Sequence, residues 1–343
     1  MVPGRGGAAI PQRYLLSIDG GGIRGIIPLC ALVELERVTG RLTRETFSFA
    51  AGTSTGAIIA AGIAAGIPAA RMLELYMAHA PRLFVSSPLN LPRRVVLGWM
   101  YPTRRVYDII AADLGEARRW RLNDAPIDLL ITAKRVTDGW PWYFVRANPR
   151  NSGRTGHLGL ASCATASSAA PTYFRPWVIR EDPAERPPGG DPIGQLVDGG
   201  VGVTGNPVYQ ACVEAFFYSE GYTPEETTVV SLGTGRYVGK ARPTWIWSWL
   251  GWILGELLRS PGEQQTEIVL RHFPQAPFYR IDVVLEEDIP LDGADRIDDL
   301  RRYGERLAAQ IDWRPILEGR DSPFRVDASR TLWSQYARSV GRV

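Results

Sequence analysis

The chain has 343 residues, of which 45% are hydrophobic and 22% charged, so it is long enough for one large α/β domain or two smaller domains. This composition excludes an intrinsically disordered chain and a collagen-like repeat. The 39 basic and 36 acidic residues leave a net charge of +3, which is too balanced to indicate binding to a nucleic-acid polymer.

The N-terminal segment and the cysteines indicate in which cellular compartment the protein is expected. Residues 1–12 contain several glycines and no apolar stretch of signal-peptide length, and no later segment has about 18 consecutive apolar residues. The three cysteines, Cys30, Cys163 and Cys212, are odd in number and lack C-x-x-C spacing, so neither a disulfide framework nor a zinc site is predicted. We expect a flexible leader over 1–12, a cytoplasmic location, and no membrane-spanning helix.

The first 65 residues predict two strand-turn-helix units. Asp19 and three glycines end the first strand, and Gly40 ends the helix that follows it. Repeated units of this kind predict a parallel sheet with crossover helices, which is the α/β class. In chain order the predicted elements are the strand 14–18, the helix 26–38, the strand 47–50 and the helix 57–65.

The sheet is expected to continue far along the chain. Residues 180–192 are rich in proline, glycine and charge, and are interpreted as a surface excursion inside the domain. Helices are predicted over 72–80 and near 296–310, and further strands over 127–133, 142–146, 195–197, 228–232 and 278–284.

Gly52-Thr53-Ser54-Thr55-Gly56 matches the nucleophile elbow, in which small flanking residues let the chain turn sharply and expose the serine hydroxyl. The motif follows a predicted strand and opens a predicted helix, which is the context that the elbow requires. The alternative interpretation is a helix start capped by Thr53 or Ser54.

The glycine-rich turn Asp19-Gly20-Gly21-Gly22-Ile23-Arg24-Gly25 offers unobstructed backbone N–H groups at the start of a helix, as an oxyanion hole requires. It also matches the G-x-G-x-x-G dinucleotide pattern. A dinucleotide site needs an acidic residue at the end of the second strand, but that strand ends in the serine elbow and Glu45 precedes it. We therefore favour the oxyanion hole.

The base that would activate Ser54 has two candidates. Of the three histidines, His79, His157 and His272, none lies in a recognisable motif, and only His272 follows in the usual order of serine, acid and histidine. Asp198-Gly199-Gly200 follows the strand 195–197 and places a carboxylate at a strand end, where α/β ligand sites form. A direct Ser-Asp pair and a histidine triad both remain open on these grounds.

Taken together and in this order, the glycine turn, the serine elbow and Asp198-Gly199-Gly200 resemble the patatin-like phospholipase family. The resemblance continues through 170–174 and 231–235 and covers roughly 13–313, which leaves 314–343 as a C-terminal extension. It implies one three-layer α/β domain with a mainly parallel central sheet and helices on both faces.

The resemblance also implies roles for residues. Ser54 is the expected nucleophile and Asp198 its partner in a Ser-Asp dyad, and no metal or organic cofactor is implied. The expected activity is that of a phospholipase A or lipid acyl hydrolase, a serine esterase that cleaves fatty-acyl esters of membrane glycerolipids through an acyl-enzyme. The expected oxyanion-hole residues are Gly20, Gly21, Gly22, Arg24, Gly25 and Thr55, and the expected supporting residues are Asp19, Gly52, Gly56, Gly199 and Gly200.

Two other functions remain open. Because some bacterial relatives in this family are gated by cyclic nucleotides, the chain could be an effector that degrades membrane lipid only when a small regulatory ligand or a partner binds. It could also be a catalytically inactive lipid-binding module. No feature of the sequence indicates an oligomeric state.

The segment 245–254 contains four of the eleven tryptophans and is too short to span a bilayer. As a helix it would place Trp245, Trp249 and Trp252 on one side. Since tryptophan favours the boundary between membrane and water, these residues are a candidate lipid interface for peripheral contact with phospholipid or another glycerolipid. A buried helix that covers the sheet is the alternative.

Overall fold

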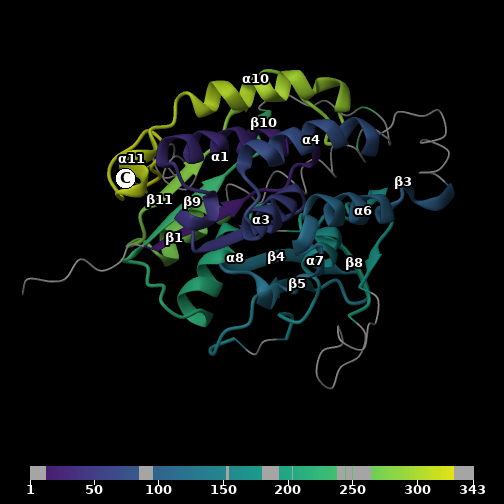
Figure 1. The fold of residues 1–343 in the computed structure, drawn as a ribbon, viewed down its shortest axis with the longest axis horizontal. Helices are drawn as coiled ribbons and strands as arrows, with labels where there is room; N and C mark the ends of the chain where they lie inside the picture. Colours follow the sequence, from purple (N-terminus) through teal and green to yellow (C-terminus); the bar gives the residue numbers. More distant parts are fainter. Residues whose placement is uncertain are drawn as a thin grey trace, which may run out of the picture.

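The computed structural model describes residues 13–84, 96–151, 154–179, 193–202, 204–237 and 264–327, together with Thr244 and Trp249. A central sheet with the strand order β11-β9-β1-β2-β4-β8-β7, and with β5 beside β4, runs through the molecule. The five strands from β11 to β4 are parallel, whereas β5 and β8 both pair antiparallel with β4. Helices cover both faces of this sheet (Figure 1). The predicted α/β class is confirmed.

The strands of the sheet are β1 Arg13–Ile18, β2 Phe49–Gly52, β4 Asp128–Arg135, β5 Pro141–Val145, β7 Trp177–Val178, β8 Gln195–Asp198, β9 Thr227–Leu232 and β11 Phe278–Ile281. Two small sheets pair β3 Trp99–Tyr101 with β6 Thr172–Phe174, and β10 Arg236–Tyr237 with β12 Val284–Leu285. The α-helices are α1 Ile26–Thr39, α2 Thr43–Thr46, α3 Thr55–Ala65, α4 Ala69–Leu83, α6 Thr103–Asp113, α7 Leu160–Ser167, α8 Val208–Val213, α10 Ile297–Ala308 and α11 Trp313–Leu317. Short turns of helix are η1 Gly22–Gly25, η2 Gly115–Arg119, η3 Leu122–Asp124, η4 Glu214–Tyr218 and η5 Ala294–Arg296, and a further helix spans 264–272.

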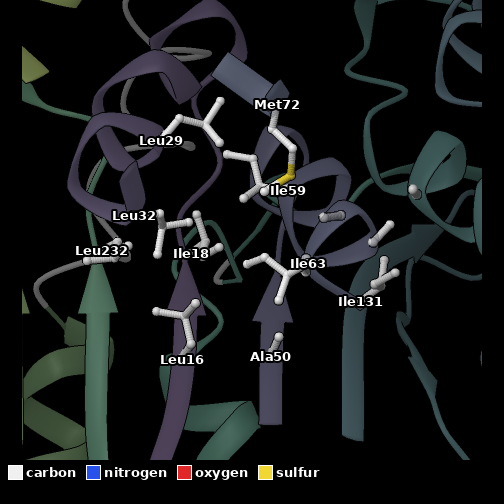
Figure 2. Close-up of a cluster of buried hydrophobic side chains, with 14 of the residues drawn as sticks. Leu16, Ile18, Leu29, Leu32, Ala50, Ile59, Ile63, Met72, Ile131 and Leu232 are labelled. Carbon is white, nitrogen blue, oxygen red and sulfur yellow. The ribbon is translucent and has the colours of Figure 1, made fainter. Parts of the chain in front are cut away.

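Both faces of the sheet are apolar, which is why the strands read as short continuous hydrophobic runs. Successive side chains of a strand point to opposite faces. Leu16 and Ile18 of β1 therefore lie in the larger core beneath α1, α3 and α4, which Figure 2 shows with Ala50, Ile131 and Leu232 of the neighbouring strands. Leu15 and Phe49 lie on the other face, packed with residues of α8 and of the helix 264–272.

Two predicted strands differ from the structure. The strand predicted at 47–50 lies two residues later, because Thr43–Thr46 form a helical turn and the Phe47 N–H donates to the Thr43 carbonyl at 2.9 Å. The strand predicted over 278–284 breaks after Ile281, where the Asp282 carboxylate accepts bonds from the N–H groups of Gly235 and Val283. The predicted excursion at 180–192 lies outside the described residues.

The chain beyond residue 313 packs against the domain as far as residue 327. Trp313 and Ile316 are fully buried in the larger core. Farther on, the Arg280 N–H donates to the Phe324 carbonyl and the Val326 N–H to the Phe278 carbonyl, at 2.9 and 3.0 Å. These contacts attach the C-terminal residues to the outer strand β11.

We expect Trp313→Ala to lower the free energy of unfolding by about 3–5 kcal/mol, since the substitution removes a buried indole and leaves a cavity. Urea unfolding followed by circular dichroism measures the change. Trp140→Ala is the matched control, because Trp140 is 67% exposed and its loss should change little. Equal effects of the two substitutions would mean that residues near 313 do not belong to the folded core.

Candidate active site

Ser54 lies in a sharp turn between β2 and α3. Its φ of 55° and ψ of −121° form a left-handed conformation that non-glycine residues rarely adopt. The turn is fixed by hydrogen bonds on both sides of Ser54: its N–H donates to the Ser167 hydroxyl at 2.8 Å, and the Ser168 hydroxyl donates to its carbonyl at 3.1 Å. The neighbouring Thr53 hydroxyl contacts that of Thr132 at 2.6 Å. The serine is 8% exposed and faces a cavity.

The two glycines of the elbow are required by the close approach of the backbone. A Cβ atom on Gly52 would lie 2.1 Å from the Gly56 carbonyl oxygen, and one on Gly56 would lie 2.2 Å from the Ile18 carbonyl oxygen. Neither backbone can move aside without breaking the sheet or the start of α3. The G-x-S-x-G spacing therefore has a steric cause in this chain, as the elbow interpretation predicted.

The register of the sheet brings Asp198 to the level of Ser54. Gly52 of β2 pairs with Ile131 of β4, and Asp198 of β8 pairs with Ala133, two residues farther along the same strand. Ser54 is likewise two residues beyond Gly52, so the two side chains lie on either side of the end of β4. Because β8 is antiparallel to β4, the chain runs toward Asp198 in the direction opposite to that of β2 and β4.

The Asp198 carboxylate is buried and has few partners. It is 1% exposed, accepts a bond from the Gly200 N–H at 2.8 Å, and interacts through a side-chain hydrogen bond with Ser54. No arginine or lysine in the described part of the chain forms an ion pair with it. Burial raises the pKa of Asp198 to about 6, although the bonds from Ser54 and Gly200 act in the opposite direction. A carboxylate of this kind can accept a proton near neutral pH.

Three backbone N–H groups next to Ser54 are candidates for binding an oxyanion. Gly21, Gly22 and Thr55 line the same cavity as Ser54, and in the described residues none of their N–H groups has a hydrogen-bond acceptor. The Gly20 N–H is different, because it donates to the Gly205 carbonyl at 2.9 Å. Preorganised N–H donors of this type stabilise negative charge that develops on a carbonyl oxygen.

The glycine turn is fixed by a partly buried ionic network that was not predicted from the sequence. The Arg280 guanidinium donates two bonds to Asp19, at 2.9 and 2.6 Å, and one to Asp282 at 3.1 Å. Asp282 in turn accepts from the Gly235 N–H at 2.9 Å, and Arg24 donates to the carbonyl of Gly235. Burial raises the pKa of Asp19 to about 6 against the effect of Arg280. The turn is therefore tied to the segment that follows β9.

Ser54 and Asp198 lie at one end of an apolar cavity of about 100 Å³. Its walls come mainly from α4 and α6, with additions from α3 and β6. Apolar walls of this kind suit the hydrocarbon part of a ligand. The apolar side chains around it include Ile58, Leu75, Leu83, Phe84, Val106, Ile110 and Phe174.

None of the three histidines lies between Ser54 and Asp198, where a catalytic triad would require one. His272 is exposed on the other face of the sheet, where its Nδ1 contacts the Tyr209 hydroxyl at 3.0 Å. His79 lines the cavity, but its Nε2 is 3.0 Å from Asp113 rather than from Ser54 or Asp198. His157 is partly buried and does not line the cavity. In the described structure, only Asp198 is therefore placed to act on Ser54.

The structure brings together most of the candidate site residues. Ser54, Thr55, Asp198, Gly21 and Gly22 line one cavity. The residues that hydrogen-bond to this group and fix its position were not predicted from the sequence. Of these, only Ser167 and Ser168 had a sequence signal, because they lie shortly before the 170–174 motif. The remaining candidates do not line this cavity: Asp19, Gly20, Arg24, Gly25, Gly52, Gly56, Gly199 and Gly200. The missed residues are Thr132, Ser167, Ser168, Thr234 and Arg280.

No site for a metal ion or a membrane span was found in the described residues. They contain no group of three or more histidine, cysteine, aspartate or glutamate side chains that could hold a metal. None of the helices in this part of the chain is long and apolar enough to cross a membrane. Cys30, Cys163 and Cys212 are buried, and none of them forms a disulfide in the described residues.

The fold and the site define an α/β protein with an elbow serine beside a buried carboxylate. A profile of the patatin-like phospholipase family matches residues 16–211, and the chain belongs to this family. A cGAMP-activated phospholipase of Vibrio cholerae is 30% identical over 48% of this chain and 50% of its own length. Patatin-17 of Solanum cardiophyllum is 27% identical over 67% of this chain and 64% of its own. Human GIVD cytosolic phospholipase A2 aligns with 90% of this chain and 60% of its own at 12% identity and a TM-score of 0.44.

The chain spans about half the length of the Vibrio cholerae relative, so its activity as a whole protein is treated below as a proposal. The family assignment confirms the resemblance that the three motifs indicated.

We expect Arg280→Met to lower the free energy of unfolding by about 3–5 kcal/mol at pH 7, because it leaves the buried Asp19 and the partly buried Asp282 without their cation. The loss should be smaller at pH 5. A carboxyl whose pKa is raised in the folded state costs stability as pH rises above its unfolded value, and removal of Arg280 raises the pKa of Asp19 further. Chemical unfolding at both pH values measures this. Arg301→Met, which breaks an exposed pair with Glu305, is the control and should have little effect.

Proposed function

We propose that the chain is a lipid acyl hydrolase of the phospholipase A type, a serine esterase that acts through a Ser54-Asp198 dyad. The observation that carries the proposal is the placement around one apolar cavity of a strained elbow serine, a buried carboxylate and backbone N–H groups, with no ion pair to the carboxylate and no acceptor for these N–H groups among the described residues. Family membership supports lipid acyl esters as the substrate class.

The chemistry proceeds in two halves. In the first, Asp198 accepts the proton of the Ser54 hydroxyl while Oγ attacks the ester carbonyl carbon. The N–H groups of Gly21, Gly22 and Thr55 stabilise the oxyanion, and the leaving alcohol takes the proton as the ester bond breaks. In the second half, Asp198 accepts a proton from water, which attacks the acyl-enzyme and releases the fatty acid. Ser54 regains its proton, and the enzyme returns to its starting state.

The cavity accounts for the lipid part of the proposal. Its apolar walls would hold the acyl chain while the ester carbonyl lies at Ser54. Arg24 lies behind the glycine turn and donates to the Gly21 carbonyl, so we assign it to support of the oxyanion hole. Gly20 and Gly25 have the same supporting role, because a side chain on Gly25 would lie 2.2 Å from the Thr55 hydroxyl.

We expect Ser54→Ala and Asp198→Asn each to lower kcat for ester hydrolysis by about 1000-fold or more while the protein stays folded. A fluorophosphonate probe should label Ser54 of the native protein, and mass spectrometry of the labelled peptide checks the site. Ser219→Ala is the matched control, since Ser219 is also buried but bonds to Asn148 away from the cavity. A large loss in His272→Ala with a small one in Asp198→Asn would overturn the dyad.

The rate should depend on pH through Asp198. Because the carboxylate must be ionised to accept the serine proton, kcat/KM should rise with pH and level off above about 6, where the pKa of Asp198 lies. Initial rates with a neutral soluble ester between pH 4.5 and 8 measure the profile. If kcat/KM did not change with pH in this range, the role of Asp198 as the base would be contradicted.

We propose that the protein acts in the cytoplasm, at the surface of a membrane, with Trp245, Trp249 and Trp252 at the lipid interface. Trp249 is 46% exposed, and an exposed indole at a lipase surface suits the boundary between membrane and water. Trp245 and Trp252 lie outside the described residues.

The double substitution Trp249→Ser and Trp252→Ser should slow hydrolysis of phosphatidylcholine vesicles several-fold more than hydrolysis of a soluble ester, because only the first reaction needs contact with a bilayer. Parallel assays on the two substrates give this ratio. Trp140→Ser, at another exposed tryptophan, is the control. An equal loss on both substrates would favour the alternative of a buried helix.

A second candidate is a phospholipase that is gated by a small ligand. The observation that favours it is the name of the Vibrio cholerae relative, a cGAMP-activated phospholipase. Basal hydrolysis by the purified protein, measured with and without cGAMP, separates a constitutive enzyme from a gated one. A catalytically inactive lipid-binding module is the remaining alternative, and labelling of Ser54 by the fluorophosphonate probe would exclude it.

A further inference from the structure

A second cavity, of about 470 Å³, lies at the other end of the sheet. It is lined at the amino ends of β1, β2 and β4, by residues that include Arg13, Ser48 and Asp128. It shares no lining residue with the cavity around Ser54, which lies beyond the carboxyl ends of β1 and β2. Twelve residues line it, and apart from two tyrosines only Pro126 and Ile127 are apolar. A fatty-acyl chain would find little apolar surface there.

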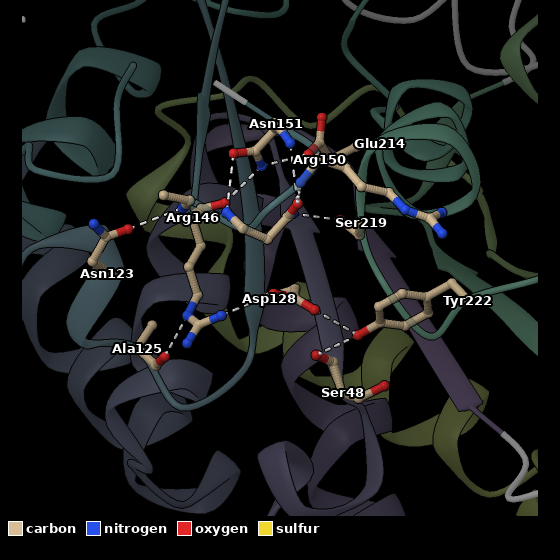
Figure 3. A network of polar contacts seen from close by, with 12 residues as sticks. Ser48, Asn123, Ala125, Asp128, Arg146, Arg150, Asn151, Glu214, Ser219 and Tyr222 are labelled. Atoms are coloured by element: carbon tan, nitrogen blue, oxygen red, sulfur yellow. Dashed lines mark hydrogen bonds and ion pairs between the residues drawn. The ribbon is translucent and has the colours of Figure 1, made fainter. Parts of the chain in front are cut away.

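Part of the charge in this cavity is already paired. Arg146 bonds to the Asp128 carboxylate at 3.3 Å and to the Ala125 carbonyl at 2.9 Å (Figure 3). The Tyr222 hydroxyl lies 2.9 Å from the Asp128 carboxylate and 3.0 Å from the Ser48 carbonyl, and these two acceptors share its one hydrogen. This network fixes the floor of the cavity across β2 and β4. It also neutralises Asp128, so that carboxylate does not offset the other cations.

Three further arginines line the cavity and have no carboxylate partner in the described part of the chain. Arg13 lies over the Tyr222 ring, with its Cζ 5.9 Å from the ring centre, and Arg44 donates to the Ala64 carbonyl. The bonds of Arg41 in the described residues join its backbone N–H and carbonyl to the Thr39 hydroxyl and do not involve its guanidinium. The one remaining lining carboxylate, Glu45, accepts the Leu42 N–H at 2.8 Å as a helix cap. Three cations against one anion leave a surplus of two positive charges.

We infer that this cavity binds a small hydrophilic molecule that carries a phosphate group, held by Arg13 and Arg41 with Arg44 beside them. Guanidinium groups recognise phosphate oxygens through charge-assisted and bidentate hydrogen bonds. A doubly charged phosphate matches the surplus charge, and the cavity has the size of a small-molecule site rather than of a bare ion site. The inference concerns binding alone and does not depend on the hydrolase proposal.

Isothermal titration calorimetry at constant ionic strength tests the inference with the full-length protein. The probes are inorganic phosphate, glycerol 3-phosphate and 5′-AMP, with adenosine and glycerol as the matching compounds without phosphate. We expect saturable binding of at least one phosphate compound and none of adenosine or glycerol. The tightest of the three identifies the source: a free phosphate, a lipid-headgroup type of ligand, or a nucleotide.

The variant Arg13→Gln/Arg41→Gln should weaken that binding at least tenfold while its melting temperature stays close to that of the native protein. Arg118→Gln/Arg119→Gln removes the same charge from two exposed arginines that line neither cavity, and it should bind as the native protein does. A Kd above about 1 mM for all three phosphate compounds would overturn the inference. Equal weakening in the two double variants would overturn it as well, since binding would then follow net charge alone.

Discussion

The geometry of the site depends on one backbone constraint, the left-handed conformation of Ser54. Such a turn costs free energy and persists only where the surroundings enforce it. Here β2 and α3 enforce it from either side, because Gly52 and Gly56 let the two elements approach closer than any side chain would permit. The hydrogen bonds from Ser167 and Ser168 then fix the turn from α7 and the residue after it. The Ser54 hydroxyl is thus positioned by rigid elements and not by a loop.

Two buried carboxylates of the site are treated in opposite ways. Asp19 receives two hydrogen bonds from Arg280, so burial costs it less and it can serve as a structural anchor for the glycine turn. Asp198 forms no ion pair within the described residues, where its partners are the Ser54 hydroxyl and the Gly200 N–H. Burial raises the pKa of both carboxylates to about 6, so their partners distinguish them: Asp19 bonds to Arg280, whereas Asp198 bonds to the Ser54 hydroxyl, from which a base would accept a proton. The same residue type is therefore suited to support in one place and to proton transfer in the other.

The α/β class and most strands could be predicted from the sequence, because each rests on local signals: apolar runs, glycines and strand ends. Such signals singled out Ser54 and Asp198 but left a Ser-Asp pair and a histidine triad both open, and the dyad was implied only by the family resemblance. The antiparallel direction of β8 and the break after Ile281 were not predictable, since both depend on contacts between distant segments. Arg280 could not be recognised for the same reason, as it lies 261 residues from Asp19. The domain limits of 13 and 313 stay a prediction, although the burial of Ile316 argues for a later end.

The two ends of the parallel strands have opposite chemistry. At the carboxyl ends the sheet opens into an apolar cavity with a carboxylate of raised pKa, and at the amino ends into a polar cavity with an excess of arginine. The strand β2 runs from one cavity to the other. Ser48, whose carbonyl contacts the Tyr222 hydroxyl in the arginine cavity, immediately precedes β2, and Ser54 follows two residues after its end. A ligand at the amino end can influence Ser54 only if it binds two arrangements of this strand with different affinity. The buried pairing of β2 with β1 and β4 resists such a shift, so the proposed binding at the arginine cavity and the proposed catalysis at Ser54 are separable.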